Sequence, residues 1–450
     1  MNSDASLILM EKNMSRVDDV DVALRNAVHS RRIFKIESPY RAPTTEFWSV
    51  LPNKTEKEKL KTVLDADDVS SPLLRLNFQQ KLVEIFGNIE IAKAQGSQSL
   101  NLSVLPSPLG RISLASNTTV TSDPSIQMQK SASWNLQVVS WAPAVRFIGR
   151  LKGYAYKWNQ PRQTTIYIID NGLDPLVSED FLQPFRGVTW YFPPWARKTK
   201  TDEDPDWHGS CVSSLAAGLE HGVSKESKIL MFKSSQRLGD ILWAFSTIRD
   251  TFKSGSREGQ KGSVILFTAS ARSSSETLPY WIRIKDIIQE LFQAGAIVVV
   301  PAGNYVEGKA QSRQIDTIPA LWSNETFPLV VVGAVNHLRW RAPFSQEPKG
   351  VTVYAPGENV RCAHHDPSWY DLHLDAGVSG TSYAAAMVAG LLAYYLSFQE
   401  PPFVVGNRGT AQAAVEYLKH RNSSWSRTND DVNVLWNGLD GSNKSYVNEA

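Results

Sequence analysis

The chain has 450 residues but only two cysteines, Cys211 and Cys362. So few cysteines exclude a framework of several disulfides and a zinc site built from thiolates. A single bridge between them stays open as an alternative, but the sequence favours two buried free thiols.

The sequence also lacks long apolar runs. None approaches the roughly 18 residues needed to cross a bilayer, so no membrane partner is expected. The apolar stretch SLILM near the N-terminus is shorter than the hydrophobic region of a signal peptide, about 7–15 residues. Seven glycosylation sequons would suit secretion. We therefore expect a secreted protein if the N-terminus is incomplete and an intracellular one otherwise. The sequons begin at Asn13, Asn53, Asn101, Asn117, Asn324, Asn422 and Asn443.

Positive and negative charges nearly balance, since the formal net charge is +2. No basic stripe with interleaved aromatic residues is present, so nucleic acid is not an expected partner. Hydrophobic residues make up 42% of the chain and charged residues 20%, which is typical of a globular protein. We expect a monomer.

The composition of the chain changes at about residue 130, which separates two regions. The segment 95–133 is rich in Ser, Thr, Asn and Pro, and it predicts an exposed linker. Before it, 46–51 predicts a strand and 54–64 a charged helix. The predicted domains are therefore a small α+β or partly disordered region over 1–130 and a larger domain over 131–450.

The larger domain alternates buried strands with amphipathic helices. Continuous β-branched runs between such helices indicate a mostly parallel central sheet with helices on both faces, a three-layer α/β fold. The predicted strands are 164–169, 227–233, 263–270, 296–300, 329–335 and 351–355; the predicted helices are 208–218, 239–252, 282–292 and 377–396.

Functional side chains of such folds gather beyond the carboxyl ends of the strands. Asp170 directly follows the first of these strands, although Asp-Asn-Gly is also a common turn sequence. Asn304 follows a later strand, where an amide can stabilise a developing oxyanion or belong to an ordinary turn.

Two further candidates lie at helix starts. His208 precedes a small-residue helix, where it could be a cap or a satisfied polar residue; the adjacent Gly209 would leave room for its ring. Ser382 begins the apolar helix, and taken alone it is better explained as an N-cap. However, the N–H groups and dipole of a helix start would also stabilise negative charge near its oxygen.

The four motifs in this order resemble those of the subtilisin-like serine proteases (subtilases, peptidase family S8), and their surroundings resemble the fungal type. IIDNGLD resembles the Asp motif, HGSCVSSLAAG the His motif, PAGN the oxyanion-hole motif and GTSYAAAMVAG the Ser motif. The chain order Asp, His, Ser is that of subtilisin. The resemblance covers about 134–441, and 46–69 is faintly similar to a subtilase propeptide.

The resemblance implies a serine endopeptidase acting on proteins or peptides. Asp170, His208 and Ser382 would form the catalytic triad and Asn304 the oxyanion hole. No cofactor is expected to be required, although the family resemblance leaves a structural calcium ion open. The alternative is a catalytically impaired relative that acts as a binding or regulatory module. If 1–130 is a prosegment, we expect self-cleavage between about residues 122 and 133.

Three segments depart from the family pattern or suggest other sites. ILFTASARSSS (265–275) lacks the usual Gly of the pocket edge and carries Arg272, so substrate specificity is not predicted. The acidic run 201–208 could bind a cation or influence His208 through Asp206, but a solvated loop is favoured. A metal site at His364, His365 and Asp366 is not favoured, so we predict no metal ligands.

Overall fold

The structure is a computed structural model of the chain. It describes residues 6–9, 17–38, 45–51, 53, 55–56, 59–60, 118–120, 125–158, 160–174, 187–196, 204, 207–235, 237–254, 263–272, 277–306, 312–347, 349–363, 377–406, 408–420, 423–426 and 432–442. The candidate metal residues 364–366 lie outside these ranges.

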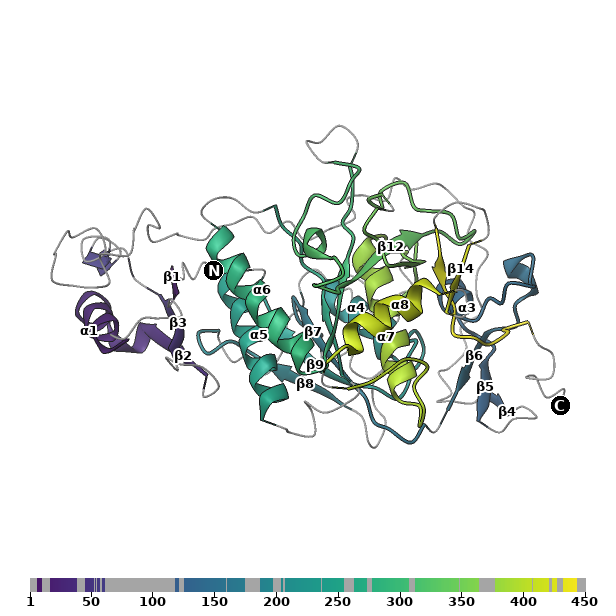
Figure 1. Cartoon of the computed structure of the whole chain (residues 1–450), viewed down its shortest axis with the longest axis horizontal. Helices are drawn as coiled ribbons and strands as arrows, with labels where there is room; N and C mark the ends of the chain where they lie inside the picture. The colour runs from purple at the N-terminus through teal and green to yellow at the C-terminus, as the bar shows by residue number, and fades with distance from the viewer. Residues whose placement is uncertain are drawn as a thin grey trace, which may run out of the picture.

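Nine strands of the described chain form the central sheet, in the order β14-β15-β13-β12-β11-β10-β7-β9-β8 (Figure 1). All neighbouring pairs are parallel except β14 and β15. The mostly parallel sheet predicted from the sequence is confirmed. The strands are β7 Thr165–Asp170, β8 Val188–Tyr191, β9 Lys228–Lys233, β10 Ser263–Phe267, β11 Ile297–Pro301, β12 Val330–Val335, β13 Val353–Pro356, β14 Ser424–Trp425 and β15 Val434–Leu435.

Helices cover both faces of this sheet, as predicted. Alternate side chains of β7 point to opposite faces: Ile166 and Ile168 join one core with α4 and α7, while Tyr167 and Ile169 join a second core with α5 and α6. The helices are α3 Trp134–Val139, α4 His208–Ala217, α5 Leu238–Lys253, α6 Leu278–Gln293, α7 Thr381–Leu396 and α8 Thr410–Lys419, with the 3₁₀ turns η1 Ser30–Arg32, η2 Ile148–Arg150 and η5 Ala320–Trp322.

Helix α7 passes through the first core and packs closely against α4. A Cβ atom on Gly390 would come within 2.4 Å of the carbonyl oxygen of Ala216, so only glycine allows this approach. The close packing brings the N-terminal turns of the two helices toward the same edge of the sheet.

The winding of the sheet reverses at β7. The chain runs from β7 to β8 and back to β9 on one side, and then crosses to β10 on the other side of β7. Such a reversal leaves a crevice beyond the carboxyl ends of the neighbouring strands β7 and β10. Open α/β sheets bind their ligands in such a crevice. Asp170 ends β7 at this position.

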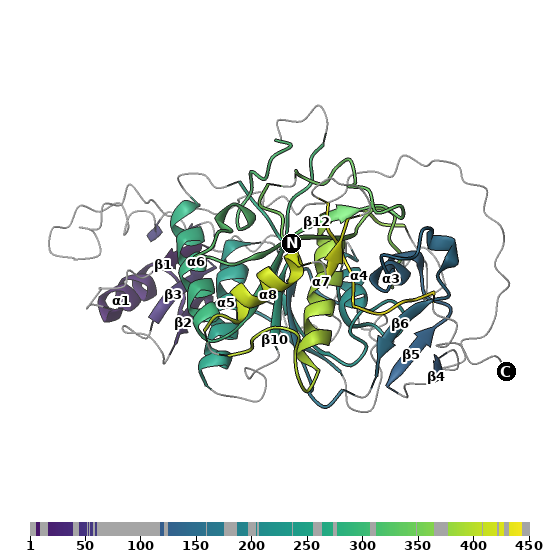
Figure 2. The same ribbon diagram turned by 45° about the vertical axis from the view of Figure 1, so that its right-hand side comes forward.

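A small N-terminal unit packs against α5 at one end of the molecule (Figures 1 and 2). Its strands have the order β1-β3-β2. The rings of Phe34 and Phe47 pack against the ring of Trp195, with centroids 6.1 and 6.2 Å away. Ser38 donates a hydrogen bond to Asp250 of α5 at 2.8 Å. The elements are β1 Ser6–Leu9, α1 Val17–Ala27, β2 Ile33–Glu37 and β3 Thr45–Val50. The strand predicted over 46–51 is therefore confirmed, and the described residues of 54–64 are helical.

The exposed linker predicted over 95–133 is wrong at residues 118–120 and 126–129, which form strands. Strand β5 lies between β4 and β6 in a separate antiparallel sheet, and its Met128 is fully buried. The strands are β4 Thr118–Val120, β5 Ile126–Gln129 and β6 Tyr154–Lys157. Strand β5 thus pairs with β6, which lies in the predicted larger domain.

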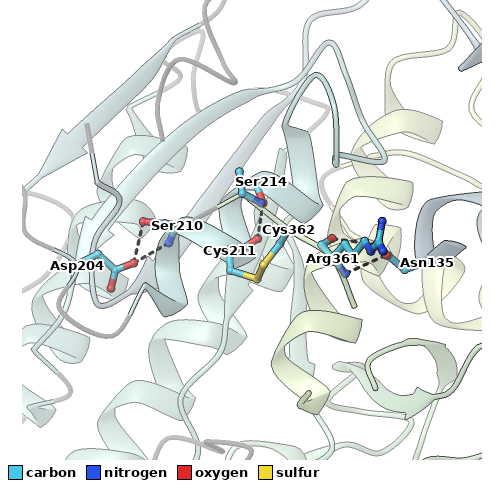
Figure 3. Close-up of a disulfide and its surroundings, with 8 residues drawn as sticks. Asn135, Asp204, Ser210, Cys211, Ser214, Arg361 and Cys362 are labelled. Atoms are coloured by element: carbon cyan, nitrogen blue, oxygen red, sulfur yellow. Dashed lines mark hydrogen bonds between the residues drawn. A yellow bond between two sulfur atoms is a disulfide. The ribbon is translucent and has the colours of Figure 1, made fainter. Parts of the chain in front are cut away.

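The two cysteines form a disulfide, so the prediction of free thiols is wrong (Figure 3). Cys211 lies on α4 and Cys362 in the segment after β13, with their Cα atoms 5.1 Å apart. The two residues are 151 positions apart in sequence, and only the packed fold shows that they meet.

The described part of the chain contains no helix long and apolar enough to span a membrane. Within the same residues, no group of three or more His, Cys, Asp or Glu side chains is arranged to hold a metal ion.

Candidate active site

Asp170 is a buried carboxylate at the carboxyl end of β7. It accepts hydrogen bonds from the backbone N–H of Asn171 at 2.7 Å and from the hydroxyl of Thr268 at 2.5 Å. Thr268 directly follows β10, the neighbouring strand at the reversal of the sheet. These donors hold the carboxylate in one orientation.

His208 is the first residue of α4, and its ring faces that carboxylate. The ring atom Nδ1 lies 2.8 and 3.0 Å from the two carboxyl oxygens of Asp170. The sequence analysis explains Gly209 as leaving room for the imidazole. In the structure, Gly209 instead contacts the turn after Asp170, and a Cβ atom on Gly209 would lie 1.9 Å from the carbonyl oxygen of Gly172. Gly209 therefore allows the helix to approach β7 closely enough for the pair to form.

Asn304 lies three residues beyond β11 and contacts the start of α7. Its Oδ1 atom accepts hydrogen bonds from the backbone N–H and the hydroxyl of Thr381, both at 3.0 Å. Because the carbonyl side of the amide faces Thr381, the NH₂ group is directed away from that residue. The amide is thereby oriented beside the helix start that carries Ser382.

Ser382 is the second residue of α7 and is buried. The N-cap is Gly380, so the interpretation of Ser382 as an N-cap is wrong. Its hydroxyl makes no hydrogen bond to any described residue, including His208. The next residue, Tyr383, lies against the His208 ring with centroids 5.3 Å apart, so the imidazole is beside the first turn of α7.

Asp204 lies four residues before His208 and is 3% exposed. Its Oδ2 atom accepts hydrogen bonds from the backbone N–H and the hydroxyl of Ser210, at 2.8 and 2.9 Å (Figure 3). Burial raises the pKa of the Asp204 carboxyl to about 7, and the negative charge of Asp170 contributes to the rise. The prediction of a solvated loop is therefore wrong for Asp204, while Asp206 lies outside the described residues.

The described residues after β10, 268–272, contact a neighbouring loop through backbone hydrogen bonds and an ion pair. Ala271 and Ile318 exchange two N–H···O bonds, at 3.0 and 2.9 Å. The Arg272 guanidinium forms an ion pair with Asp316, with Nε at 2.9 Å from Oδ2. Arg272 is therefore anchored to the neighbouring loop.

The structure thus brings Asp170 and His208 into contact and places Asn304 against the residue before Ser382. Sequence reasoning missed Thr268 and the burial of Asp204. The sequence places Thr268 inside the predicted strand 263–270, whereas β10 ends at Phe267, so the position of Thr268 after the strand was not recognised. Asp204 could not be separated from the other acids of its run.

The subtilase family matches residues 162–420 of the chain, more than half of its length. The four site residues and the strands β7 to β13 lie within this range, whereas β14 and β15 lie beyond it. The chain belongs to the subtilase family.

Relatives that the chain resembles include fungal proteases. A cuticle-degrading serine protease of Arthrobotrys oligospora is 28% identical over 256 residues, which cover 55% of this chain and 56% of the relative. Alkaline protease 2 of Aspergillus fumigatus is 29% identical over 294 residues, or 62% of this chain and 52% of the relative. The chain spans about half the length of the curated relatives it matches.

Among solved structures, a cold adapted subtilisin-like serine proteinase aligns with a TM-score of 0.48 at 22% identity. The alignment covers 68% of this chain and 97% of that chain.

Proposed function

We propose that the chain is a serine endopeptidase that hydrolyses protein or peptide substrates. The observation that carries the proposal is the buried pair of Asp170 and His208, whose ring lies beside the helix start of Ser382. The relatives support it, since one is named a serine protease and the other an alkaline protease.

In this mechanism Ser382 attacks the scissile carbonyl, while His208 accepts the hydroxyl proton and later gives it to the leaving amine. Asp170 holds the imidazole through Nδ1, so that Nε2 faces the reacting groups, and its charge stabilises the imidazolium that forms. The carboxylate is itself held by Thr268 and Asn171.

The tetrahedral oxyanion would be stabilised by two donors. One is the NH₂ group of Asn304, which is oriented by the bonds of its carbonyl oxygen to Thr381. The other is the backbone N–H of Ser382, one of the N–H groups that the first turn of a helix leaves without an intrahelical partner. The proposed steps require no metal or cofactor.

Hydrolysis of casein by the purified protein tests the proposal. We expect turnover by the wild type and none by Ser382→Ala, because loss of the triad serine in subtilisin lowers kcat by a factor on the order of 10⁶. A casein assay in which wild type and Ser382→Ala are equally active, or equally inactive after any processing, would reject it.

The second candidate is a catalytically impaired subtilase that acts as a binding module. It is favoured by one observation, that the Ser382 hydroxyl makes no hydrogen bond to His208. Catalytic hydrogen bonds are often formed only with substrate bound, so this geometry does not by itself exclude catalysis. The same casein assay separates the two candidates.

We further infer that the N-terminal unit belongs to a prosegment removed before activity. Cleavage is expected before Ile126 rather than throughout the region 122–133 predicted from the sequence, because β5 is paired on both sides and buried. N-terminal sequencing and intact mass of the active protein test this. A fully active, full-length chain would contradict it.

A further inference from the structure

The first turn of α4 has no cap from its own N-cap residue. That residue is Trp207, which has a left-handed backbone at φ 51°, and an indole cannot accept a hydrogen bond. The N–H groups of a helix start nevertheless need acceptors. Asp204 supplies them: its carbonyl oxygen accepts from the N–H of Trp207 at 3.0 Å, and its carboxylate accepts from the N–H of Ser210 at 2.8 Å.

The same carboxylate connects α4 to the segment that follows Asp170. The Ser210 hydroxyl donates to Asp204 at 2.9 Å and accepts from the backbone N–H of Asp174, also at 2.9 Å. Asp174 lies four residues after Asp170. A chain of hydrogen bonds therefore runs from the loop after β7, through the first turn of the His208 helix, to the buried Asp204.

Asp204 also interacts electrostatically with both His208 and Asp170. Among the described residues, three further titratable groups come from the elements packed around Asp204 and His208. Asp170 ends β7, Lys233 is its register partner on β9, and Tyr383 of α7 lies against the imidazole. Burial, together with the charge of Asp170, raises the pKa of Asp204 to about 7, so its charge changes near neutral pH.

We propose that Asp204 is a positioning residue for His208, which fixes the first turn of α4 and whose ionised carboxylate, together with Asp170, favours the imidazolium form. This inference rests on the proposed function only in so far as His208 acts as the general base.

The substitution Asp204→Asn removes the charge and keeps an oxygen that can accept from Ser210. A neutral amide stabilises the imidazolium less, so the acid limb of the kcat/KM profile should move to lower pH by about half a pH unit. Glu416→Gln is the matched control: it removes one carboxylate from the exposed side of α8 and should leave the profile unchanged. Asp204→Ala also removes the helix contact, so it should lower kcat/KM at every pH.

The kinetic test is paired with one that needs no turnover. In the Ser382→Ala background, the His208 ring is titrated by NMR with and without Asp204→Asn, and folding is checked by circular dichroism. We expect the imidazole midpoint to move to lower pH in the Asp204→Asn protein. If that variant does not fold, Ser210→Ala, which removes one donor to the carboxylate, should move the midpoint in the same direction by less.

The outcomes are distinguishable. A shifted NMR midpoint in a protein that hydrolyses no peptide supports the role of Asp204 and rejects the proposed protease function. Peptide hydrolysis with the same acid limb and NMR midpoint in wild type and Asp204→Asn overturns the inference, because Asp204 would then act only as a helix cap.

Discussion

Removal of the disulfide between Cys211 and Cys362 should lower the free energy of unfolding by about 5 kcal/mol. The bond joins α4, three residues after His208, to the segment after β13. In the chain-entropy relation, a cross-link that closes a loop of 151 residues restricts the unfolded chain by an amount corresponding to about 5 kcal/mol at 25 °C.

The folded state should change little when the bond is removed, because hydrogen bonds hold both sides of Cys362. Arg361 and Asn135 exchange two bonds, at 3.1 and 3.3 Å, and the N–H of Ala363 donates to Ser214 of α4 at 3.0 Å (Figure 3). The expected loss therefore arises mainly from the unfolded chain, and the native contacts of the segment should survive.

Equilibrium unfolding in urea measures this difference, followed by tryptophan fluorescence and circular dichroism in the Ser382→Ala background to prevent self-digestion. The variants are Cys211→Ala, Cys362→Ala and the double variant. Each single variant already loses the bond. The double variant should therefore be less stable than either single variant by at most about 1 kcal/mol.

A direct count of thiols accompanies the unfolding experiment. The unreduced wild type, denatured before titration, should expose no free thiol, and it should expose two after reduction. A stability loss below about 1 kcal/mol in the double variant, or two thiols before reduction, would refute this argument.

Three further substitutions test individual contacts of the site. Thr268→Val removes a hydrogen bond to the Asp170 carboxylate; such bonds contribute about 1.5–3 kcal/mol, so kcat/KM on a chromogenic peptide should fall roughly 10–100-fold, and a change under twofold would count against it. Asn304→Ala should lower kcat by about 10²–10³, the loss known for the corresponding donor of subtilisin, with KM nearly unchanged; a loss confined to KM would contradict the oxyanion role. The folded-state pKa of Asp204 is raised to about 7, so its contribution to stability is fully present below the unfolded pKa of about 3.9 and is lost as pH rises through 7. The free energy of unfolding of Asp204→Asn, measured relative to the wild type by urea unfolding, should therefore rise by roughly 2–4 kcal/mol from pH 4 to pH 8. A difference between the two proteins that is the same at both pH values would exclude this linkage.

The sequence predicts the strands β7 and β9 to β13 of the central sheet because most of their residues are buried. It does not predict β8, whose residues are only half-buried, or the two-residue strands β14 and β15. The β7 residues 165–170 are all buried, and a continuous β-branched run reports that environment directly. The positions of Asp170 and Asn304 follow from the same rule, since side chains after parallel strands meet at one edge of the sheet.

The remaining features depend on partners far away in sequence. Strand β5 has a polar pattern, IQMQ, and its buried state comes from pairing with β4 and β6. The Cys211–Cys362 bond requires knowing that α4 meets the segment after β13. The burial of Asp204 depends on the turn at Trp207 that folds it back onto α4, which composition does not reveal.

The central claim is that Ser382 is a nucleophile activated by His208 and Asp170. Labelling with a fluorophosphonate probe, followed by peptide mapping, tests it most directly. The account predicts one adduct, on Ser382, in the processed wild type, no adduct in Ser382→Ala and strongly slowed labelling in His208→Ala. A folded, processed wild type that is not labelled, or a Ser382→Ala protein labelled equally well, would contradict it.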